Sequence, residues 1–386
     1  MGKCKKVFDM KNILITGGAG FIGSNLAIVL LSKGYNITVL DNLSPQIHGD
    51  KPTDTSPLFR NIIGKVNFIH GTVTSRQDWE KAIVDQDVIV HLAAETGTGQ
   101  SMYCIERYTE VNIQGTSIML DILANSKNKV KKVVVASSRS IYGEGKYISQ
   151  KLGEVYPKHR DENDMLSGDF EVKYRGHSDL ELVATDENSK VHPSSVYGIT
   201  KQNQEQMIMT VCPAIGVNPV AFRYQNVYGP GQSLSNPYTG ILSIFSTQIR
   251  NNNAIQIFED GKESRDFVYI DDVINATVLG IELDEANGHA FNVGTGVATD
   301  VLTVANTLIE SYQIEVPVNI SGRFRLGDIR HNYADMSKIK KILEFEPQTY
   351  FREGINNFTQ WVLSQEIQKD ELYDSLDEMK RKGLLK

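Results

Sequence analysis

An apolar run that breaks into a glycine-rich turn constrains this chain more than any other part of its sequence. Residues 13–16 read Ile-Leu-Ile-Thr, and glycines follow at Gly17, Gly20 and Gly23. A short apolar run bounded by glycine is consistent with a buried strand, and the residues after the turn predict a helix. A second apolar run, residues 37–40, ends in Asp41. We therefore expect a strand, a tight turn, a helix and a second, parallel strand.

This order of elements is typical of a βαβ unit that binds a dinucleotide. Gly17 allows the tight turn, Gly20 lets the backbone approach the pyrophosphate, and Gly23 lets the helix pack closely on the strand. The first helical turn, with Phe21 and Ile22, offers free N–H groups and a partial positive charge to the phosphates. These five residues are the predicted pyrophosphate site.

Asp41 indicates which dinucleotide is bound. It lies 18 residues after Gly23, at the predicted tip of the second strand. A carboxylate there accepts hydrogen bonds from both ribose hydroxyls and repels a 2′-phosphate. We therefore expect NAD rather than NADP as the cofactor, with Asn42 as a neighbouring cofactor-binding residue.

Strand and helix signals alternate through the first half of the chain. Further strands are predicted at 66–69, 88–94, 133–136 and 219–223, and a long helix is predicted over 102–125. This alternation predicts an α/β fold, a Rossmann-type doubly wound parallel sheet with helices on both faces. Ligands of such sheets bind beyond the carboxyl ends of the strands.

The predicted domain organisation follows from where this alternation loosens. Residues 1–226 are expected to form the NAD-binding Rossmann domain, with a polar insertion at about 144–192 that serves as a lid or a dimer contact. Residues 227–386 are expected to be mainly a smaller C-terminal α/β substrate-binding domain, from which about 266–300 return to the first domain. The highly charged residues 365–386 predict a solvated terminal helix.

Composition excludes several classes of function. The formal net charge is −7 and no basic stripe stands out, which disfavours nucleic acid as a partner. No run approaches the ~18 apolar residues of a membrane span, and the basic start of the chain is followed by no apolar signal core. Three isolated cysteines and scattered histidines predict neither a disulfide framework nor a metal site, and the expected location is the cytoplasm.

Tyr197 and Lys201 form a candidate catalytic pair. Their spacing of four places both side chains on one face of a helix. A free tyrosine titrates near ~10, so a phenolate base at neutral pH needs a drop of roughly 3 pKa units. Lys201 and the positive nicotinamide ring are expected to supply this drop, and Lys201 can also bond the nicotinamide ribose.

Ser138 completes this set at the end of the predicted fifth strand. A hydroxyl there can hold the substrate oxygen against Tyr197 and share its proton, although it could also only cap the strand end. Ser137 is the neighbouring candidate. Because side chains alternate along a strand, only one of the two serines points at the substrate.

These motifs, together with Tyr142-Gly143 and the run from His91 to Ala94, resemble the extended short-chain dehydrogenase/reductases that act on nucleotide sugars. The resemblance extends over nearly the whole chain and implies a nucleotide-diphosphate sugar as substrate and a homodimer. Further cofactor-binding residues that it implies are Leu92, Ala93, Ala94 and Asn112. The third strand lacks the usual acidic residue after it, so Thr72 or the backbone is expected to hold the adenine.

The same resemblance implies a set of substrate-binding residues. Asn226 matches a residue near the substrate, and Arg265 and Arg325 match residues that bind the diphosphate. A guanidinium suits this role because it is always charged and bonds phosphate oxygens in pairs. Without the resemblance, both arginines could equally form surface ion pairs with neighbouring aspartates. Thr96 could bond a sugar hydroxyl or could cap its own loop.

The turn after Ser138 bears on the reaction. Dehydratases of the family resembled carry Asp-Glu at this place, and decarboxylating members carry an acidic residue, whereas this chain has Arg139-Ser140. A 4-epimerase needs no further acid or base, and the finer resemblance is to the subgroup that contains dTDP-L-rhamnose 4-epimerases. The alternatives are a nucleotide-sugar ketoreductase, dehydrogenase or 4,6-dehydratase, and a non-catalytic NAD-sensing protein.

Overall fold

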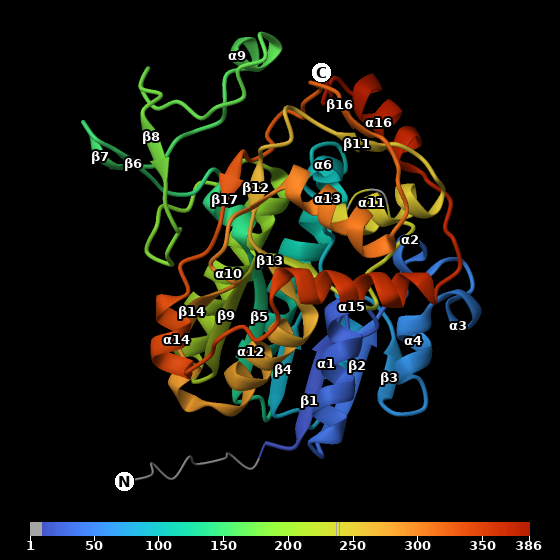
Figure 1. Ribbon diagram of the computed structural model, residues 1–386. Helices are drawn as coiled ribbons and strands as arrows, with labels where there is room; N and C mark the ends of the chain where they lie inside the picture. The colour runs from blue at the N-terminus through green and yellow to red at the C-terminus, as the bar shows by residue number, and fades with distance from the viewer. Residues whose placement is uncertain (1–9, 237, 239) are drawn as a thin grey trace.

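The computed structural model describes residues 10–236, 238 and 240–386. The basic first residues, with Cys4, lie outside this described part. A seven-stranded parallel sheet forms the centre of the molecule, and helices cover both of its faces (Figure 1). Among the described residues, none of the helices combines the length and the apolar character that a membrane crossing needs.

The order of the strands is β14-β9-β5-β4-β1-β2-β3, and every neighbouring pair is parallel. They are β1 (Asn12–Thr16), β2 (Asn36–Asp41), β3 (Asn67–His70), β4 (Val88–His91), β5 (Lys132–Ser138), β9 (Asn218–Tyr224) and β14 (His289–Val293). The chain winds outward in one direction from β1 and in the other from β4, so a crevice opens at their carboxyl ends. The predicted Rossmann-type fold is confirmed.

Two apolar cores hold the sheet between its helices. Along β1, Ile13 and Ile15 belong to one core and Leu14 to the other. Successive side chains of a strand point to opposite faces, so strands buried on both faces are continuous apolar runs. The helices of the first core include α1 (Phe21–Ser32) and α12 (Ile270–Glu282), and those of the second include α8 (Gly115–Asn125) and α10 (Val196–Ala214).

The helix expected over 102–125 is continuous from residue 105 to residue 125 but changes type along its length. It consists of α7 (Ile105–Tyr108), a π-helical segment η1 (Thr109–Gln114) and α8. Asn112 lies in η1, where its Oδ1 accepts the Glu95 N–H at 2.8 Å and its Nδ2 donates to the Glu95 carbonyl at 3.1 Å. π turns are often found at functional sites. Apolar periodicity alone could not indicate this one.

A smaller group of elements from the C-terminal half lies beyond the carboxyl ends of the sheet (Figure 1). Its short strands pair as β10 with β13, β11 with β16, and β15-β12-β17. These strands are β10 (Asn226–Tyr228), β11 (Ile255–Ile257), β12 (Ser264–Arg265), β13 (Phe267–Tyr269), β15 (Thr299–Asp300), β16 (Val318–Ile320) and β17 (His331–Asn332). Its helices include α11 (Ile241–Arg250), α13 (Val301–Tyr312), α15 (Phe351–Leu363) and α16 (Leu372–Arg381).

Shorter helices complete the chain. They are α2 (Pro45–His48), α3 (Pro52–Thr55), α4 (Pro57–Ile62), α5 (Arg76–Ala82), α6 (Thr98–Ser101), η2 (Arg139–Tyr142), α9 (Glu162–Leu166), η3 (Asp284–Ala286) and α14 (Ser337–Leu343). Of these, η2 begins directly after β5 and α6 follows the loop after β4, and both contribute residues to the crevice.

The insertion at 144–192 forms a separate antiparallel sheet that extends from the body of the molecule (Figure 1). Its strands are β6 (Tyr147–Ser149), β7 (Gly153–Val155) and β8 (Leu180–Leu182). Arg160 anchors it, since this buried guanidinium donates to both carboxylate oxygens of Glu259 at 2.7 and 2.8 Å. No residue of the insertion lines the crevice, so nothing in its position favours a lid.

The expectation of a solvated C-terminal helix is wrong. Helix α16 buries Leu372, Leu376 and Met379 against the partly buried side chains of Ile244 and Phe258. These three residues recur every three to four positions, which makes a narrow apolar stripe on an otherwise charged helix. Because residues 365–386 are highly charged, their composition alone does not indicate the apolar stripe.

Leu376→Ala should weaken the docking of α16 by about 2–4 kcal/mol, because it removes a buried side chain that the core cannot refill. Tyr373→Ala, on the exposed face of the same helix, is the matched control and should have little effect. Amide hydrogen exchange of residues 372–381 measures the difference. Equal exchange in both variants would show that this helix does not pack as described.

Candidate active site

A cavity of about 590 Å³ opens at the carboxyl ends of the central strands. This volume suits a site for a small molecule or cofactor. The predicted site residues that line it are Gly17, Gly20, Phe21, Ile22, Gly23, Asp41, Asn42, Leu92, Ala93, Ala94, Thr96, Ser138, Tyr197, Lys201, Asn226, Arg265 and Arg325. Asn112 does not line it, and instead fixes the loop at Glu95 from behind the wall.

The glycine turn has the geometry that the sequence predicts. Gly17 has a φ of +66°, and a Cβ on it would approach the backbone of Ala93 to 2.8 Å. A Cβ on Gly23 would lie 2.4 Å from the Gly17 carbonyl oxygen, so the helix packs on the turn only without a side chain there. Gly20 caps α1 without a side-chain hydrogen bond, which leaves the first N–H groups of the helix available to an anion.

Asp41 ends β2 beside this turn. Its Oδ2 accepts the Ala19 N–H at 2.9 Å and its Oδ1 accepts the Leu43 N–H at 2.8 Å. These bonds fix the carboxylate next to the glycine turn, where it lines the cavity. His48 lies 3.9 Å from Asp41, and burial lowers the pKa of its imidazole although the carboxylate opposes this effect.

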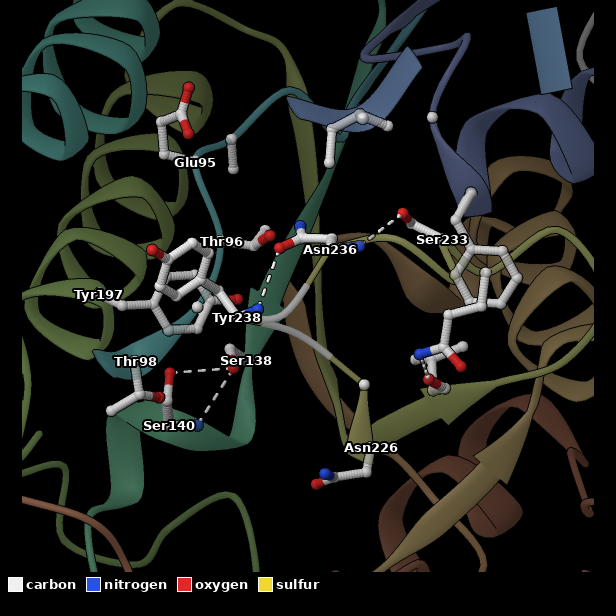
Figure 2. A pocket seen from close by; sticks show the side chains of 18 of the residues that line it. Glu95, Thr96, Thr98, Ser138, Ser140, Tyr197, Asn226, Ser233, Asn236 and Tyr238 are labelled. Carbon is white, nitrogen blue, oxygen red and sulfur yellow. Dashed lines mark hydrogen bonds between the residues drawn. The ribbon is translucent and has the colours of Figure 1, made fainter. Parts of the chain in front are cut away.

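The two serines at the end of β5 divide their roles as alternation requires. The hydroxyl of Ser137 donates to Glu205 at 2.5 Å. Ser138 faces the cavity, where its oxygen accepts bonds from the N–H and the hydroxyl of Ser140 at 3.1 and 2.9 Å (Figure 2). Ser138 is therefore the serine available to a substrate.

Tyr197 lies in the first turn of α10, and its ring extends into the same part of the cavity (Figure 2). Burial raises the pKa of its phenol, while the hydrogen bond with Ser138 and the positive charge of Arg139 lower it. Its backbone N–H donates to Ser101 at 3.0 Å, which fixes the start of the helix. Ser138 and Tyr197 line the same part of the cavity (Figure 2), and Arg139 is a nearby cation that the sequence did not indicate.

Lys201 is held by a buried chain of polar groups. Its Nζ donates to Gln204 Oε1 at 2.7 Å, and Gln204 Nε2 donates to Thr116 at 3.0 Å. Thr116 contacts one ring nitrogen of His91 at 3.0 Å, and Thr16 contacts the other at 2.8 Å. This series of hydrogen bonds thus connects Lys201 with β1, the strand that precedes the glycine turn.

Burial shifts the pKa values of the two titratable groups in this hydrogen-bonded series, Lys201 and His91. It lowers the pKa of Lys201 to about 7, although Glu205 opposes the effect. Burial and the charge of Lys201 lower the pKa of His91 to about 3, so this imidazole is neutral near neutral pH. Gln204 gave no signal in the sequence, because only the fold brings it against Lys201 and Thr116.

A buried ion pair fixes α10 against the sheet. Arg223 of β9 donates to Glu205 of α10 through Nε at 3.0 Å and Nη2 at 2.5 Å. Arg223 also donates to the Tyr142 hydroxyl at 2.7 Å, and that hydroxyl donates to Asn292 of β14 at 2.8 Å. With the bond from Ser137, these contacts connect the helix of Tyr197 and Lys201 to three neighbouring strands.

The two predicted diphosphate-binding arginines, Arg265 and Arg325, also line the cavity. Arg325 pairs with Asp328 at 2.8 Å, and Arg265 approaches the same carboxylate at 3.4 Å. Burial raises the pKa of Asp328, but these guanidiniums outweigh it and lower the pKa to about 2. Asp266, the aspartate that follows Arg265 in the sequence, is buried and, among the described residues, accepts backbone N–H groups of Thr295 and Gly296 instead of pairing with an arginine.

The sequence analysis did not predict the apolar wall that α16 contributes to the cavity. Leu372, Leu376 and Met379 of α16 line it together with Phe258, and Glu378 of the same helix accepts the Tyr238 hydroxyl at 2.7 Å. The three-to-four-residue spacing of the apolar residues was the signal that could have revealed this wall. Figure 2 shows Tyr238 and Thr98 among the side chains of this site.

Comparison with known proteins agrees with this geometry. A family model described as NAD dependent epimerase/dehydratase family matches residues 13–161 and 176–294. This chain belongs to that family. Its cofactor is NAD, as the sequence predicted, and the glycine turn, the uncapped start of α1 and the fixed carboxylate of Asp41 fit this dinucleotide.

Individual relatives of this epimerase family cover nearly the whole chain. The dTDP-L-rhamnose 4-epimerase of Burkholderia thailandensis is 35% identical over 363 residues, 94% of this chain and 97% of the relative. The structure of the Thermotoga maritima UDP-glucose 4-epimerase with UDP-glucose has a TM-score of 0.73 at 28% identity, covering 91% of this chain and 98% of that one. The Bacillus cereus UDP-glucuronic acid 4-epimerase with UDP-glucuronic acid and NAD has a TM-score of 0.73 at 25% identity, covering 91% and 99%. The chain is thus an isomerase of the NAD-dependent nucleotide-sugar epimerase family.

Glu205→Gln should lower the free energy of unfolding by about 3 kcal/mol, because it leaves the buried Arg223 without its counter-charge. Glu310→Gln is the matched control: it breaks the exposed pair with Arg352 and should change stability little. Chemical denaturation at neutral pH measures both variants. Equal stability of the two variants would contradict a structural role for the buried pair.

Proposed function

We propose that this enzyme is a nucleotide-sugar 4-epimerase that acts through a 4-keto sugar, with dTDP-L-rhamnose and dTDP-6-deoxy-L-talose as the pair it interconverts. The observation that carries the proposal is that Ser138, Tyr197 and Lys201 line the same cavity as the NAD-binding glycine turn. The choice of sugar is supported by the 35% identity to the Burkholderia thailandensis enzyme.

The proposed chemistry needs few protein groups. NAD, when bound, supplies the hydride acceptor and donor of the redox step. Tyr197 takes the proton of the sugar hydroxyl as that carbon is oxidised, and returns it when the carbon is reduced from its other face. Ser138 holds the same oxygen against the phenol. Lys201, anchored by Gln204, keeps further N–H groups for the cofactor ribose and for stabilising the phenolate.

Dehydration is disfavoured by the groups around Ser138. A 4,6-dehydratase needs an additional acid and base next to the reacting carbons, and η2 offers Arg139 and Ser140 there. Two carboxylates elsewhere in the cavity pair closely with arginines: Glu95 lies 2.8 Å from Arg107, and Asp328 lies 2.8 Å from Arg325. A third, Glu263, lies 3.7 Å from Arg330, and burial raises its pKa to about 7. Arg325 and Arg265 lower the pKa of Asp328 to about 2, so this carboxylate is a poor proton donor.

A panel of dTDP-, UDP- and GDP-sugars tests this function. The enzyme should convert dTDP-L-rhamnose into its 4-epimer with no net change in NADH absorbance, because hydride returns to the same sugar. Net NADH formation or consumption would instead identify a dehydrogenase or ketoreductase, and a 4-keto-6-deoxy product would identify a dehydratase. Binding of NAD with no turnover of any sugar would leave the NAD-sensing alternative.

Tyr197→Phe should lower kcat by roughly 10²- to 10⁴-fold, because it removes the group that transfers the hydroxyl proton. Tyr238→Phe, a second cavity-lining tyrosine whose hydroxyl donates to Glu378, is the matched control and should retain most of its activity. Product separation after timed incubation measures both. Unchanged turnover in Tyr197→Phe would refute the catalytic assignment.

A further inference from the structure

Four arginines line the cavity, and three of them have a carboxylate partner. These pairs are Arg107–Glu95 at 2.8 Å, Arg265–Asp328 at 3.4 Å and Arg325–Asp328 at 2.8 Å. Arg265 is also occupied by the backbone, since its Nη1 donates to the carbonyls of two residues at 2.8 Å each. Arg139 is the exception. Within residues 10–236, 238 and 240–386, no carboxylate lies within 4 Å of its guanidinium nitrogens.

The position of Arg139 is fixed by its neighbours. It is the first residue of η2, directly after Ser138, and its Nε donates to the side-chain oxygen of Asn226 at 2.6 Å. Its Nη1 is buried and has no hydrogen-bond partner in the described structure. The contact with Asn226 therefore orients the guanidinium but leaves part of its donor capacity unused.

A buried guanidinium such as that of Arg139 destabilises the protein unless an acceptor binds its free N–H group. Removing an unpaired guanidinium from water carries a large desolvation penalty, and a buried donor without a partner adds to it. Burial and the nearby charge of Arg265 both lower the pKa of Arg139, so its surroundings compensate the charge poorly. Arginine nevertheless keeps its proton at neutral pH, so it acts as a donor and not as an acid or base.

The charges around Arg139 indicate where an acceptor would lie. Its guanidinium interacts electrostatically with Tyr197 and also with Arg265 and Asp328. It lines the same cavity as the phenol expected at the reacting carbon and the arginines expected at the diphosphate. An oxygen of a nucleotide sugar that spans these two points would come within reach of the unused donor.

We propose that Arg139 is a substrate-binding, specificity-determining residue whose free N–H group donates to an oxygen of the bound nucleotide sugar. The inference rests on the proposed function and adds a residue to its binding site. A diphosphate oxygen and a hexose hydroxyl are both hydrogen-bond acceptors that would satisfy the guanidinium. Asn226 then has a second role, since its side-chain oxygen holds Arg139 in position.

Equilibrium binding to the NAD-loaded enzyme tests this inference. The probes are dTDP-L-rhamnose and dTDP, or a UDP-sugar and UDP where the panel selects UDP, and calorimetry gives the dissociation constants. Arg139→Gln should weaken binding of the nucleotide sugar by about 10- to 100-fold, the effect of losing a hydrogen bond from a charged donor. Arg352→Gln, which removes an exposed arginine far from the cavity lining, is the matched control and should bind as the wild type does.

The two probes separate the sources of the acceptor. Equal loss for the nucleotide sugar and for dTDP places Arg139 on the diphosphate, whereas loss for the nucleotide sugar alone places it on the hexose. Unchanged affinity for both probes overturns the inference. If the wild type itself binds neither probe, the proposed function fails as well, so the two failures are distinguishable.

A second variant covers the case in which Arg139→Gln does not fold. Arg139→Lys keeps the charge but lacks the planar fork that reaches Asn226 and a ligand together. It should fold, show the wild-type thermal transition and bind the nucleotide sugar more weakly than the wild type by several-fold. Wild-type affinity in Arg139→Lys would also contradict the inference, since a charge without defined geometry would then suffice.

Discussion

The buried pair between Arg223 and Glu205 is the interaction on which the site depends. Tyr197 and Lys201 share one helix face, but a helix face acts on a ligand only if the helix is held at a fixed distance from the sheet. Glu205 lies one turn beyond Lys201 and receives Arg223 of β9 and Ser137 of β5. Because this carboxylate is buried, its bonds are strong and movement of α10 would leave charges unpaired.

Around this fixed helix, the cavity is assembled from parts with different physical tasks. The turn at Gly17 and Gly23 provides close backbone approach, and Asp41 supplies a fixed negative charge beside it. The elements of the C-terminal half add arginines on one side and the apolar wall of α16 on another. A nucleotide sugar has a charged diphosphate between a base and a hexose, so a cavity that combines charged and apolar walls matches its chemistry.

Local sequence patterns predicted the fold and the cofactor-binding part of the site. The glycine spacing, the terminal Asp41 and the apolar strands indicated the fold and the cofactor, because both depend on short-range geometry. The long helix expected over 102–125 is present from residue 105, with a π-helical segment inside it, whereas the expectation of a solvated helix over 365–386 is wrong. The π-helical segment depends on a contact between Asn112 and Glu95 across the fold, and α16 depends on apolar partners that are distant in sequence.

The sequence by itself determined the sheet, the NAD-binding turn and the residues able to transfer a proton. Each of these follows from neighbours within a few positions along the chain, where backbone geometry and side-chain alternation act directly. The tertiary structure decided which serine faces Tyr197, what anchors Lys201, which arginines are already paired and what closes the cavity. These depend on contacts between residues tens to hundreds of positions apart, and the burial that gives such contacts their strength arises only when the chain is folded.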